Sequence, residues 1–224
     1  EFYTDKTVAV HVVLDGKTPF RTVTNAYLSN GDTIVKTDDT KAVLAVLQGA
    51  NVIVTTQTKE IIEAFGEDAP AEISLFNEDK TARVHDMSLL AYLLDPTRTN
   101  YGYLYLTERF SVPSIASGSV DVECVSMVKA LLAMNDVACE SARREELWSL
   151  YETIELPLIH TLVVMEKNGI YIDTNKLAET TARFKDELAQ VQQEIYDLAG
   201  ETFNINSPKP VSYTHLTLPT ILLV

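Results

Sequence analysis

The chain has 224 residues, of which 46% are hydrophobic, and it carries a formal net charge of −14. Such a charge repels nucleic-acid phosphates at long range, so the composition gives no support to DNA binding. The sequence contains no apolar run of about 18 residues, the length that a membrane-spanning helix needs, so we expect no membrane partner. The length is enough for two modest domains, each with a core of its own.

The N-terminal sequence shows neither a methionine nor a basic segment followed by an apolar one. The first observation suggests an upstream portion before Glu1, and the second predicts no secretory signal. Cys124 and Cys139 are the only cysteines, and their spacing matches no metal-binding motif. We therefore expect a cytoplasmic protein with buried, reduced thiols.

Residues 1–145 alternate between β-branched runs and amphipathic runs. The turn-forming pairs Asp15-Gly16 and Asn30-Gly31 separate the first three extended runs. This alternation predicts an α/β fold, a mixed sheet flanked by helices. Segment 111–120, rich in Ser, Pro and Gly, is the expected loop. The expected strands are 7–14, 18–28, 33–36 and 51–56, with extended pieces at 72–76 and 82–84, and the expected helices are 39–47, 59–65, 87–94 and 122–138.

A further helix is predicted from residue 147 onward. Its apolar residues recur at threes and fours, which indicates one face packed on a core. Pro157 removes a backbone donor and should bend or restart the helix, and Asn168-Gly169 provides a left-handed end. The residues of this stripe are Leu147, Tyr151, Ile154, Leu158, Leu162 and Met165.

Another helix is predicted between Asp173, a good N-cap residue, and Gly200, a good terminator. Its apolar positions lie close to the heptad spacing of a coiled-coil seam, and the simplest interpretation is again a buried core face. Ser207 followed by Pro208 predicts the start of a third helix. The apolar positions of the helix are Leu177, Phe184, Leu188, Val191, Ile195 and Leu198.

Four short sequence segments distinguish residues 154–209 from an ordinary pair of amphipathic helices. They are IELPL at 154–158, MEKNGIYID at 165–173, EIYDLAG at 194–200 and FNINSPK at 203–209. In this order and spacing they resemble the start of the polymerase region of family A DNA polymerases, the bacterial DNA polymerase I type. Residues 84–110 also resemble part of the exonuclease domain of that family, whose fold is ribonuclease H-like.

The resemblance implies a division of the chain. Residues 1–145 correspond to a ribonuclease H-like 3′–5′ exonuclease-type domain, and residues 146–209 to the first helices of the thumb, which grips duplex DNA. Residues 210–224 are uncharged, have no helical period and resemble translated sequencing-adapter DNA, so we expect a non-native tail. The alternative is a genuine apolar tail that binds a partner.

The implied function is that of a fragment of a DNA-directed DNA polymerase I, a nucleotidyltransferase of DNA replication and repair. The palm and fingers, which join nucleotides with Mg²⁺, follow this region in the family, so the fragment alone should not polymerise and should need no cofactor. Its implied partner is primer-template DNA, bound by a monomeric complete enzyme. Two alternatives remain, an active metal-dependent 3′–5′ exonuclease and a stand-alone interaction module.

Exonucleases of this family use carboxylates that bind two divalent cations. Where the resemblance places the first Asp-x-Glu motif, this chain has His11, Val12 and Val13, and the second motif falls on Thr56 and Glu60. The third motif needs a tyrosine near residues 120–130, where none is present. We therefore predict a catalytically silent exonuclease-like domain, with no catalytic residue and no metal ligand.

Other potential ligands have ordinary structural interpretations. Asp15 reads as a turn residue and Asp86 as a helix cap. His85 sits beside Asp86 at a helix start, where neighbouring side chains diverge, and His160 is isolated in the sequence. None of these is expected to bind metal.

The expected DNA-binding residues are Asn204, Asn206, Ser207 and Lys209. By resemblance they lie where family members contact the duplex backbone and minor groove. Short amides and a hydroxyl at a helix N-terminus can donate to phosphate oxygens without reading base sequence. The alternative is that Asn206 and Ser207 only cap the following helix.

Overall fold

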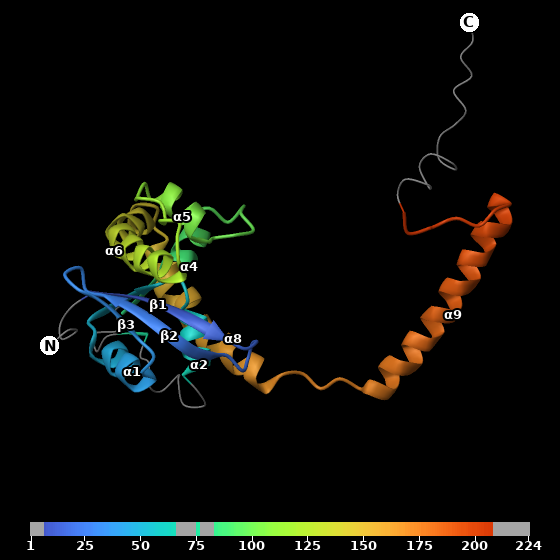
Figure 1. Ribbon diagram of the computed structural model, residues 1–224, viewed down its shortest axis with the longest axis horizontal. Helices are drawn as coiled ribbons and strands as arrows, with labels where there is room; N and C mark the ends of the chain where they lie inside the picture. Colours follow the sequence, from blue (N-terminus) through green and yellow to red (C-terminus); the bar gives the residue numbers. More distant parts are fainter. Residues whose placement is uncertain (1–6, 66–74, 77–82, 208–224) are drawn as a thin grey trace, which may run out of the picture. The chain divides into compact units, whose positions relative to one another are not determined.

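A five-stranded mixed sheet in the order β3-β2-β1-β4-β5 forms the centre of the first part of the chain (Figure 1). β1 is antiparallel to β2 and β2 to β3, whereas β4 is parallel to β1 and β5 to β4. The valine-rich sequence of β1 suits its central position, since residues 8–10 are fully buried. The strands are β1 (Thr7–Asp15), β2 (Thr22–Ser29), β3 (Ile34–Thr37), β4 (Val52–Thr55) and β5 (Val84–Asp86).

This computed structural model describes residues 7–65, 75–76 and 83–207. The chain forms two units, 1–169 and 170–224. Residues 148–168, which the resemblance assigns to the thumb, pack within the first unit, where the helix α8 (Leu156–Asn168) contacts the helix α2 (Thr58–Ala64). Most of the extended pieces expected at 72–76 and 82–84, the tail 210–224 and the helix expected after Ser207 lie outside the described residues.

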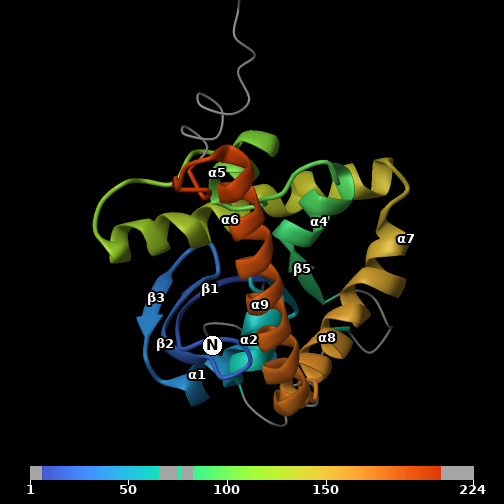
Figure 2. The same cartoon turned by 90° about the vertical axis from the view of Figure 1, so that its right-hand side faces the viewer.

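Helices cover both faces of the sheet. α6 packs on β1, β2 and β4, and α1 and α2 lie on the opposite face (Figures 1 and 2). Asp86 caps α4 as the sequence predicts, accepting from two of its backbone amides, and Asp39, predicted as the first residue of a helix, instead caps α1 in the same way. The helices are α1 (Thr40–Gly49), α2 (Thr58–Ala64), α4 (Met87–Leu94), α5 (Tyr103–Arg109) and α6 (Val120–Arg144).

The predicted α/β architecture is confirmed, with local differences. β2 begins at Thr22 rather than at residue 18, because Phe20 N–H bonds to Lys17 O in a turn after Gly16, whose φ is +90°. Helix α5 was not predicted. Among the described residues, no helix combines the length and apolar character needed to span a bilayer.

The apolar stripe predicted for residues 147–165 is wrong beyond Tyr151. Tyr151 is fully buried, but Ile154, Leu158 and Met165 are 54%, 42% and 62% exposed. The buried residues here are instead Leu156, Ile159 and Val163. The segment consists of α7 (Trp148–Leu150), the π-helix η1 (Tyr151–Glu155) and α8 (Leu156–Asn168).

The wide turn of η1 explains this shift. The amide of Leu156 bonds to Tyr151 O, five residues back, so the turn holds one residue more than an α-turn spans. One extra residue rotates the following helix by about 100°. The face that would carry Leu158 and Leu162 therefore carries Ile159 and Val163. As expected, a new helix starts beside Pro157.

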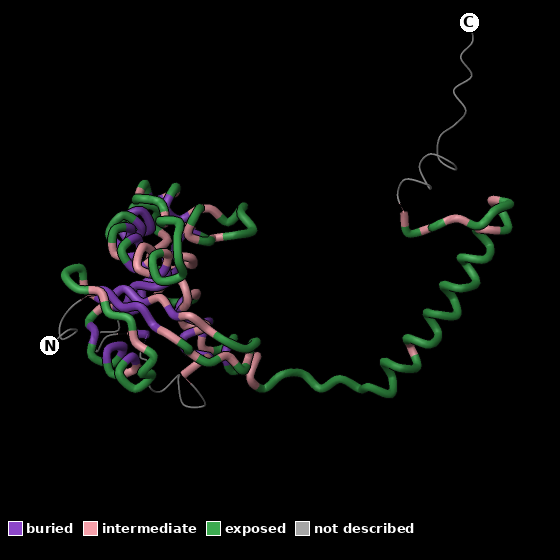
Figure 3. The backbone as a smooth tube through the Cα atoms, viewed as in Figure 1, coloured by how far each residue is buried: buried purple, intermediate pink, exposed green. Residues whose placement is uncertain are grey.

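The second unit contains the helix α9 (Thr174–Ala199). Asp173 caps its start by accepting from two backbone amides, and Gly200 ends it with φ +74° in the left-handed region, as the sequence predicts. The predicted burial of its apolar stripe is wrong within the described chain, because α9 contains no buried residue. Figure 3 shows this contrast with the buried centre of the first unit.

Candidate functional site

Ligands of open sheets commonly bind beyond the carboxyl ends of parallel strands, which here are the ends of β1 and β4. β1 and β4 pair only through residues 7–9 and 52–54. Beyond that pairing, the side-chain amide of Gln57 bridges to β1, accepting from Val12 N–H at 2.9 Å and donating to Val12 O at 3.0 Å. Beyond the backbone pairing, a neutral side-chain amide therefore bridges to β1.

The position of the first expected carboxylate is occupied by His11. The Tyr103 hydroxyl, from α5, lies 3.3 Å from His11 Nδ1, and Thr56 Oγ1 donates to the Tyr103 oxygen at 3.3 Å. The rings of His11 and Tyr103 meet edge to face at 5.8 Å between centroids. An aromatic ring and two neutral polar groups thus fill the space beside β1.

Burial keeps this cluster neutral. Desolvation lowers the pKa of His11 to about 4, so its imidazole is uncharged at neutral pH. Desolvation also raises the pKa of the Tyr103 hydroxyl, which stays protonated. Hard divalent cations prefer carboxylate oxygens, which these three residues do not offer.

The nearby carboxylates are engaged elsewhere. Glu60, on the position of the second motif, lies 3.5 Å from Arg21. Asp86 is buried, accepts from Thr58 Oγ1 at 2.6 Å and caps α4, while desolvation raises the pKa of its carboxyl. Asp15 accepts from Gly16 N–H within its turn. Across the described residues, no group of three or more His, Cys, Asp or Glu side chains could hold a metal ion.

The remaining candidates sit in ordinary packing environments. His85 Nδ1 lies 2.7 Å from Asn135 Oδ1 and 3.5 Å from Cys139 Sγ. Burial raises the pKa of the Cys139 thiol to about 12, so it is not a reactive thiolate. Burial also lowers the pKa of His160. Cys124 and Cys139 are both buried free thiols, as expected.

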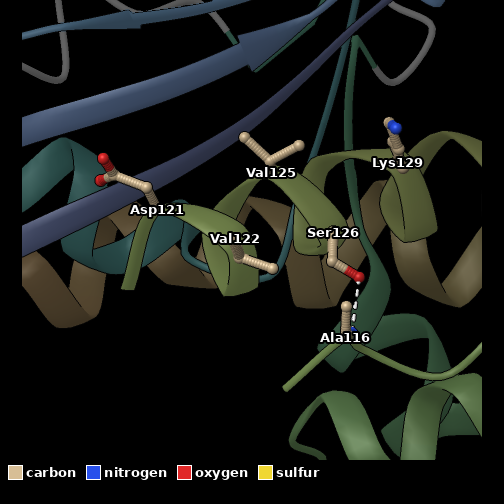
Figure 4. Close-up of a pocket in the computed structure, with 6 residues that line it drawn as sticks. All are labelled: Ala116, Asp121, Val122, Val125, Ser126 and Lys129. Carbon is tan, nitrogen blue, oxygen red and sulfur yellow. Dashed lines mark hydrogen bonds between the residues drawn. The ribbon is translucent and has the colours of Figure 1, made fainter. Parts of the chain in front are cut away.

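A shallow groove with a volume of about 360 Å³ runs along the first turns of α6 (Figure 4). Its charged groups are Asp121 and Lys129, and Asp121 is bound by the Tyr27 hydroxyl and by Lys36 Nζ at 2.8 Å. Ser126 Oγ, in the same groove, accepts from Ala116 N–H at 2.9 Å. The side chains of Asp121 and Ser126 are therefore already engaged, and the groove does not bring together a reactive set.

The predicted DNA-binding residues follow α9 in a turn. Asn204 Oδ1 accepts from Asn206 N–H at 3.1 Å, and Asn204 O accepts from Ser207 N–H at 3.0 Å. Asn204 and Asn206 are exposed and Ser207 is half-buried, so the structure brings these three together on a short loop. Lys209 lies outside the described residues.

Packing on the end of α9 fixes the start of this loop. The Tyr196 hydroxyl donates to Phe203 O at 2.9 Å, and the rings of Tyr196 and Phe203 meet edge to face at 5.6 Å. The sequence signal for this contact is the short spacing between two aromatic residues across a helix-terminating glycine. Tyr103, by contrast, was missed in the first unit, because the alternating tyrosines of NYGYLYL are more typical of a strand than of a helix.

Comparison with known proteins identifies the family. The chain is 30% identical over 188 residues to the DNA polymerase I of Caldicellulosiruptor bescii. This match covers 78% of this chain and 22% of that protein. The chain belongs to the DNA polymerase I family. It is also 47% identical over 73 residues to the DNA polymerase I of Lactococcus lactis subsp. cremoris, over 31% of this chain and 8% of that protein. No family model matches the chain.

Solved structures agree on the fold. The polymerase domain of Pol1 from M. smegmatis, in complex with DNA primer-template and dNTP, matches with a TM-score of 0.71 at 22% identity, over 93% of this chain and 36% of that one. Brucella melitensis NrnC with bound Mg²⁺ matches with a TM-score of 0.55 at 15% identity, over 77% of this chain and 92% of that one. The chain thus spans about a fifth of the length of the DNA polymerase I of C. bescii.

Proposed function

We propose that this chain is part of a DNA-directed DNA polymerase of replication and repair, and that it supplies a scaffold and a DNA-backbone contact to that enzyme. The observation that carries the proposal is the 30% identity over 188 residues with a DNA polymerase I. Nucleotide joining, its Mg²⁺ ions and the primer-template would belong to the complete enzyme, a cytoplasmic monomer.

Primer extension by the complete enzyme tests this function. The full open reading frame that contains this chain is expressed, and extension of a labelled primer on a template is followed with Mg²⁺ and the four nucleotides. We expect template-directed extension that stops when Mg²⁺ is chelated. An intact, folded product that extends no primer would contradict the proposal.

Residues 1–145 form, on this proposal, a ribonuclease H-like exonuclease-type domain. Support comes from the sheet order β3-β2-β1-β4-β5, with an antiparallel β1-β2-β3 meander and a parallel β1-β4-β5 half. The likeness to NrnC over 77% of the chain supports the same fold.

The exonuclease-type domain would be catalytically silent. The supporting observation is the contact among the neutral side chains of His11, Tyr103 and Thr56. It lies where the resemblance to the family places a metal-binding carboxylate. We expect no cleavage of a labelled single strand by the chain with Mg²⁺ or Mn²⁺. Metal-dependent shortening from the 3′ end that survives repurification would instead favour an active exonuclease.

Residues 146–209 would begin the thumb, with DNA contact through Asn204, Asn206, Ser207 and Lys209. The exposed amides of Asn204 and Asn206 support this contact, because they can donate to phosphate oxygens. In the complete enzyme, changing Asn206 and Ser207 together to Ala should weaken primer-template binding about two- to tenfold, the value of one or two hydrogen bonds. The loss should be equal for templates of different sequence.

The matched control is Gln190→Ala, an exposed amide on α9 away from the loop. It should leave the affinity unchanged. Equal affinities of the double variant and the control would show that Asn206 and Ser207 only shape the turn.

A further inference from the structure

Residues 200–207, which follow α9, are held to the end of that helix by the side chain of Tyr196. Tyr196 and Phe203 are both half-buried, and their rings meet edge to face at 5.6 Å between centroids. Gly200 lies between them in the left-handed region, so the chain turns back onto α9 directly after the helix ends. These contacts lie within the second unit and do not depend on the first.

The Tyr196 hydroxyl is the middle of a chain of three polar groups. It accepts from Gln192 Nε2 at 2.8 Å, one turn earlier in α9, and donates to Phe203 O at 2.9 Å. Both distances are typical of well-formed hydrogen bonds. A hydroxyl has a single proton, so the Gln192 amide, by donating to the oxygen, leaves that proton for Phe203 O.

The bond to Phe203 O restrains the residue that comes next. This oxygen belongs to the planar peptide group between Phe203 and Asn204, so the bond fixes the plane from which Asn204 projects. Asn204 in turn holds the following residues, because its Oδ1 accepts from Asn206 N–H at 3.1 Å and its O from Ser207 N–H at 3.0 Å. The Tyr196 hydroxyl is therefore connected to the three described residues that are predicted to bind DNA.

The hydroxyl of Tyr196 is not itself a donor to DNA. Its one proton is used on Phe203 O, so it has none left for a phosphate oxygen. Asn204 and Asn206, by contrast, are exposed. Any influence of Tyr196 on DNA binding must therefore pass through the turn that this side chain holds.

We propose that Tyr196 is a positioning residue for DNA binding, which holds the turn of Asn204, Asn206 and Ser207 in its binding shape before DNA arrives, and that Gln192 orients the Tyr196 hydroxyl. A loop that is ordered only on binding loses conformational freedom, and this loss subtracts from its affinity. A loop that is already held avoids the loss. The inference rests on the DNA contact proposed above and adds residues that control it.

The first test removes the hydroxyl alone. In the complete enzyme, Tyr196→Phe keeps the ring that packs on Phe203 and deletes both hydrogen bonds of the hydroxyl. The affinity for a primer-template, measured by titration without nucleotides, should fall about two- to tenfold, the value of one hydrogen bond. The fall should be the same for templates of different sequence, because the turn is proposed to contact the DNA backbone.

The second test combines this change with the loop variant, in which Asn206 and Ser207 are both changed to Ala. If Tyr196 acts through the turn, adding Tyr196→Phe to the loop variant should weaken binding much less than Tyr196→Phe does alone. A side chain that only stabilised α9 would add its full loss to that of the loop variant. Additive losses would therefore overturn the positioning role.

Two neighbouring glutamines provide a matched pair of variants. Both are exposed amides on α9, but Gln192 donates to the Tyr196 hydroxyl, whereas Gln193 donates to Asp197 Oδ1 at 2.8 Å. Gln192→Ala should weaken primer-template binding in the same way as Tyr196→Phe, and Gln193→Ala should leave it unchanged. Equal effects of the two glutamine variants would overturn the role of Gln192.

The failure of this inference can be told apart from the failure of the proposed DNA contact. Full affinity of Tyr196→Phe, beside a weakened loop variant, would overturn the positioning role and leave the DNA contact standing. Full affinity of the loop variant itself would contradict the DNA contact, and the positioning role would fall with it.

Discussion

Helices α6 and α9 have almost the same length, 25 and 26 residues, but opposite surroundings. α6 lies on the sheet and buries ten of its residues, among them Leu131 and Met134 at 0% exposure. No described residue of α9 is buried, although α9 has the more regular apolar repeat. An amphipathic repeat therefore predicts that a helix has an apolar face, and leaves open whether its own chain covers that face.

The sharpest test of this contrast is the same truncation in both helices. Leu131→Ala in α6 should lower the free energy of unfolding by about 2–5 kcal/mol, because it removes buried contacts and leaves a cavity. Leu188→Ala in α9 should change it by no more than about 0.5 kcal/mol in dilute solution. Urea denaturation followed by the helical signal at 222 nm, to which both helices contribute, measures both. Equal losses would refute the contrast.

Acid should act on the first unit through His11. Its pKa is about 4 in the folded chain, against about 6.5 when unfolded, so between these values the unfolded chain binds the proton and the folded chain does not. The free energy of unfolding should therefore fall as the pH is lowered from 6.5 to 4, by at most about 3 kcal/mol, and stay flat above that window.

The check on this acid effect is His11→Asn, which removes the titrating group from the same site. Denaturation curves at several pH values should show a shallower loss for this variant than for the natural chain. Identical pH profiles would mean that the burial of His11 does not control the acid response.

A smaller effect is expected at Tyr151. Its hydroxyl donates to Val84 O at 2.8 Å and accepts from Asp86 N–H at 2.9 Å. Tyr151→Phe leaves both backbone groups buried without this partner. It should lower the free energy of unfolding by about 1–3 kcal/mol. Tyr171→Phe, at a side chain that is 93% exposed in the second unit, is the control and should cost nothing measurable.

The smallest expected effect lies at the end of α9. Gly200 has a φ of +74°, which an alanine adopts at a cost of about 1 kcal/mol. Gly200→Ala should reduce the helical signal at 222 nm and leave the unfolding curve reported by Trp148 unchanged. A shift of that curve would mean that the two units unfold together.

Much of the fold is predictable from local signals. Asp86 and Asp173 were expected as helix caps and act as caps, because a capping carboxylate needs only the amides that follow it. Gly200 ends α9 as expected, because a left-handed residue is a local requirement. The valine-rich runs of β1 and β4 likewise predict buried strands.

The misses depend on tertiary contacts. Tyr103 contacts His11 only because the fold brings α5 beside β1, and no local pattern reports a contact between residues 92 positions apart. The exposed stripe of α9 was taken for core, because periodicity carries no information about what covers a helix face. Three of the residues predicted to bind DNA, Asn204, Asn206 and Ser207, lie together in the turn that follows α9. Their contact with DNA stays a prediction.

The π-turn η1 also affects how this chain should be compared with its relatives. A π-turn holds one residue more than an α-turn, so the residues after Glu155 face about 100° away from where an unbroken α-helix would place them. An alignment without a gap at 151–155 would match Leu158 and Leu162 with positions that face a core in a relative lacking the insertion. A single-residue gap within η1 would restore the match with such a relative.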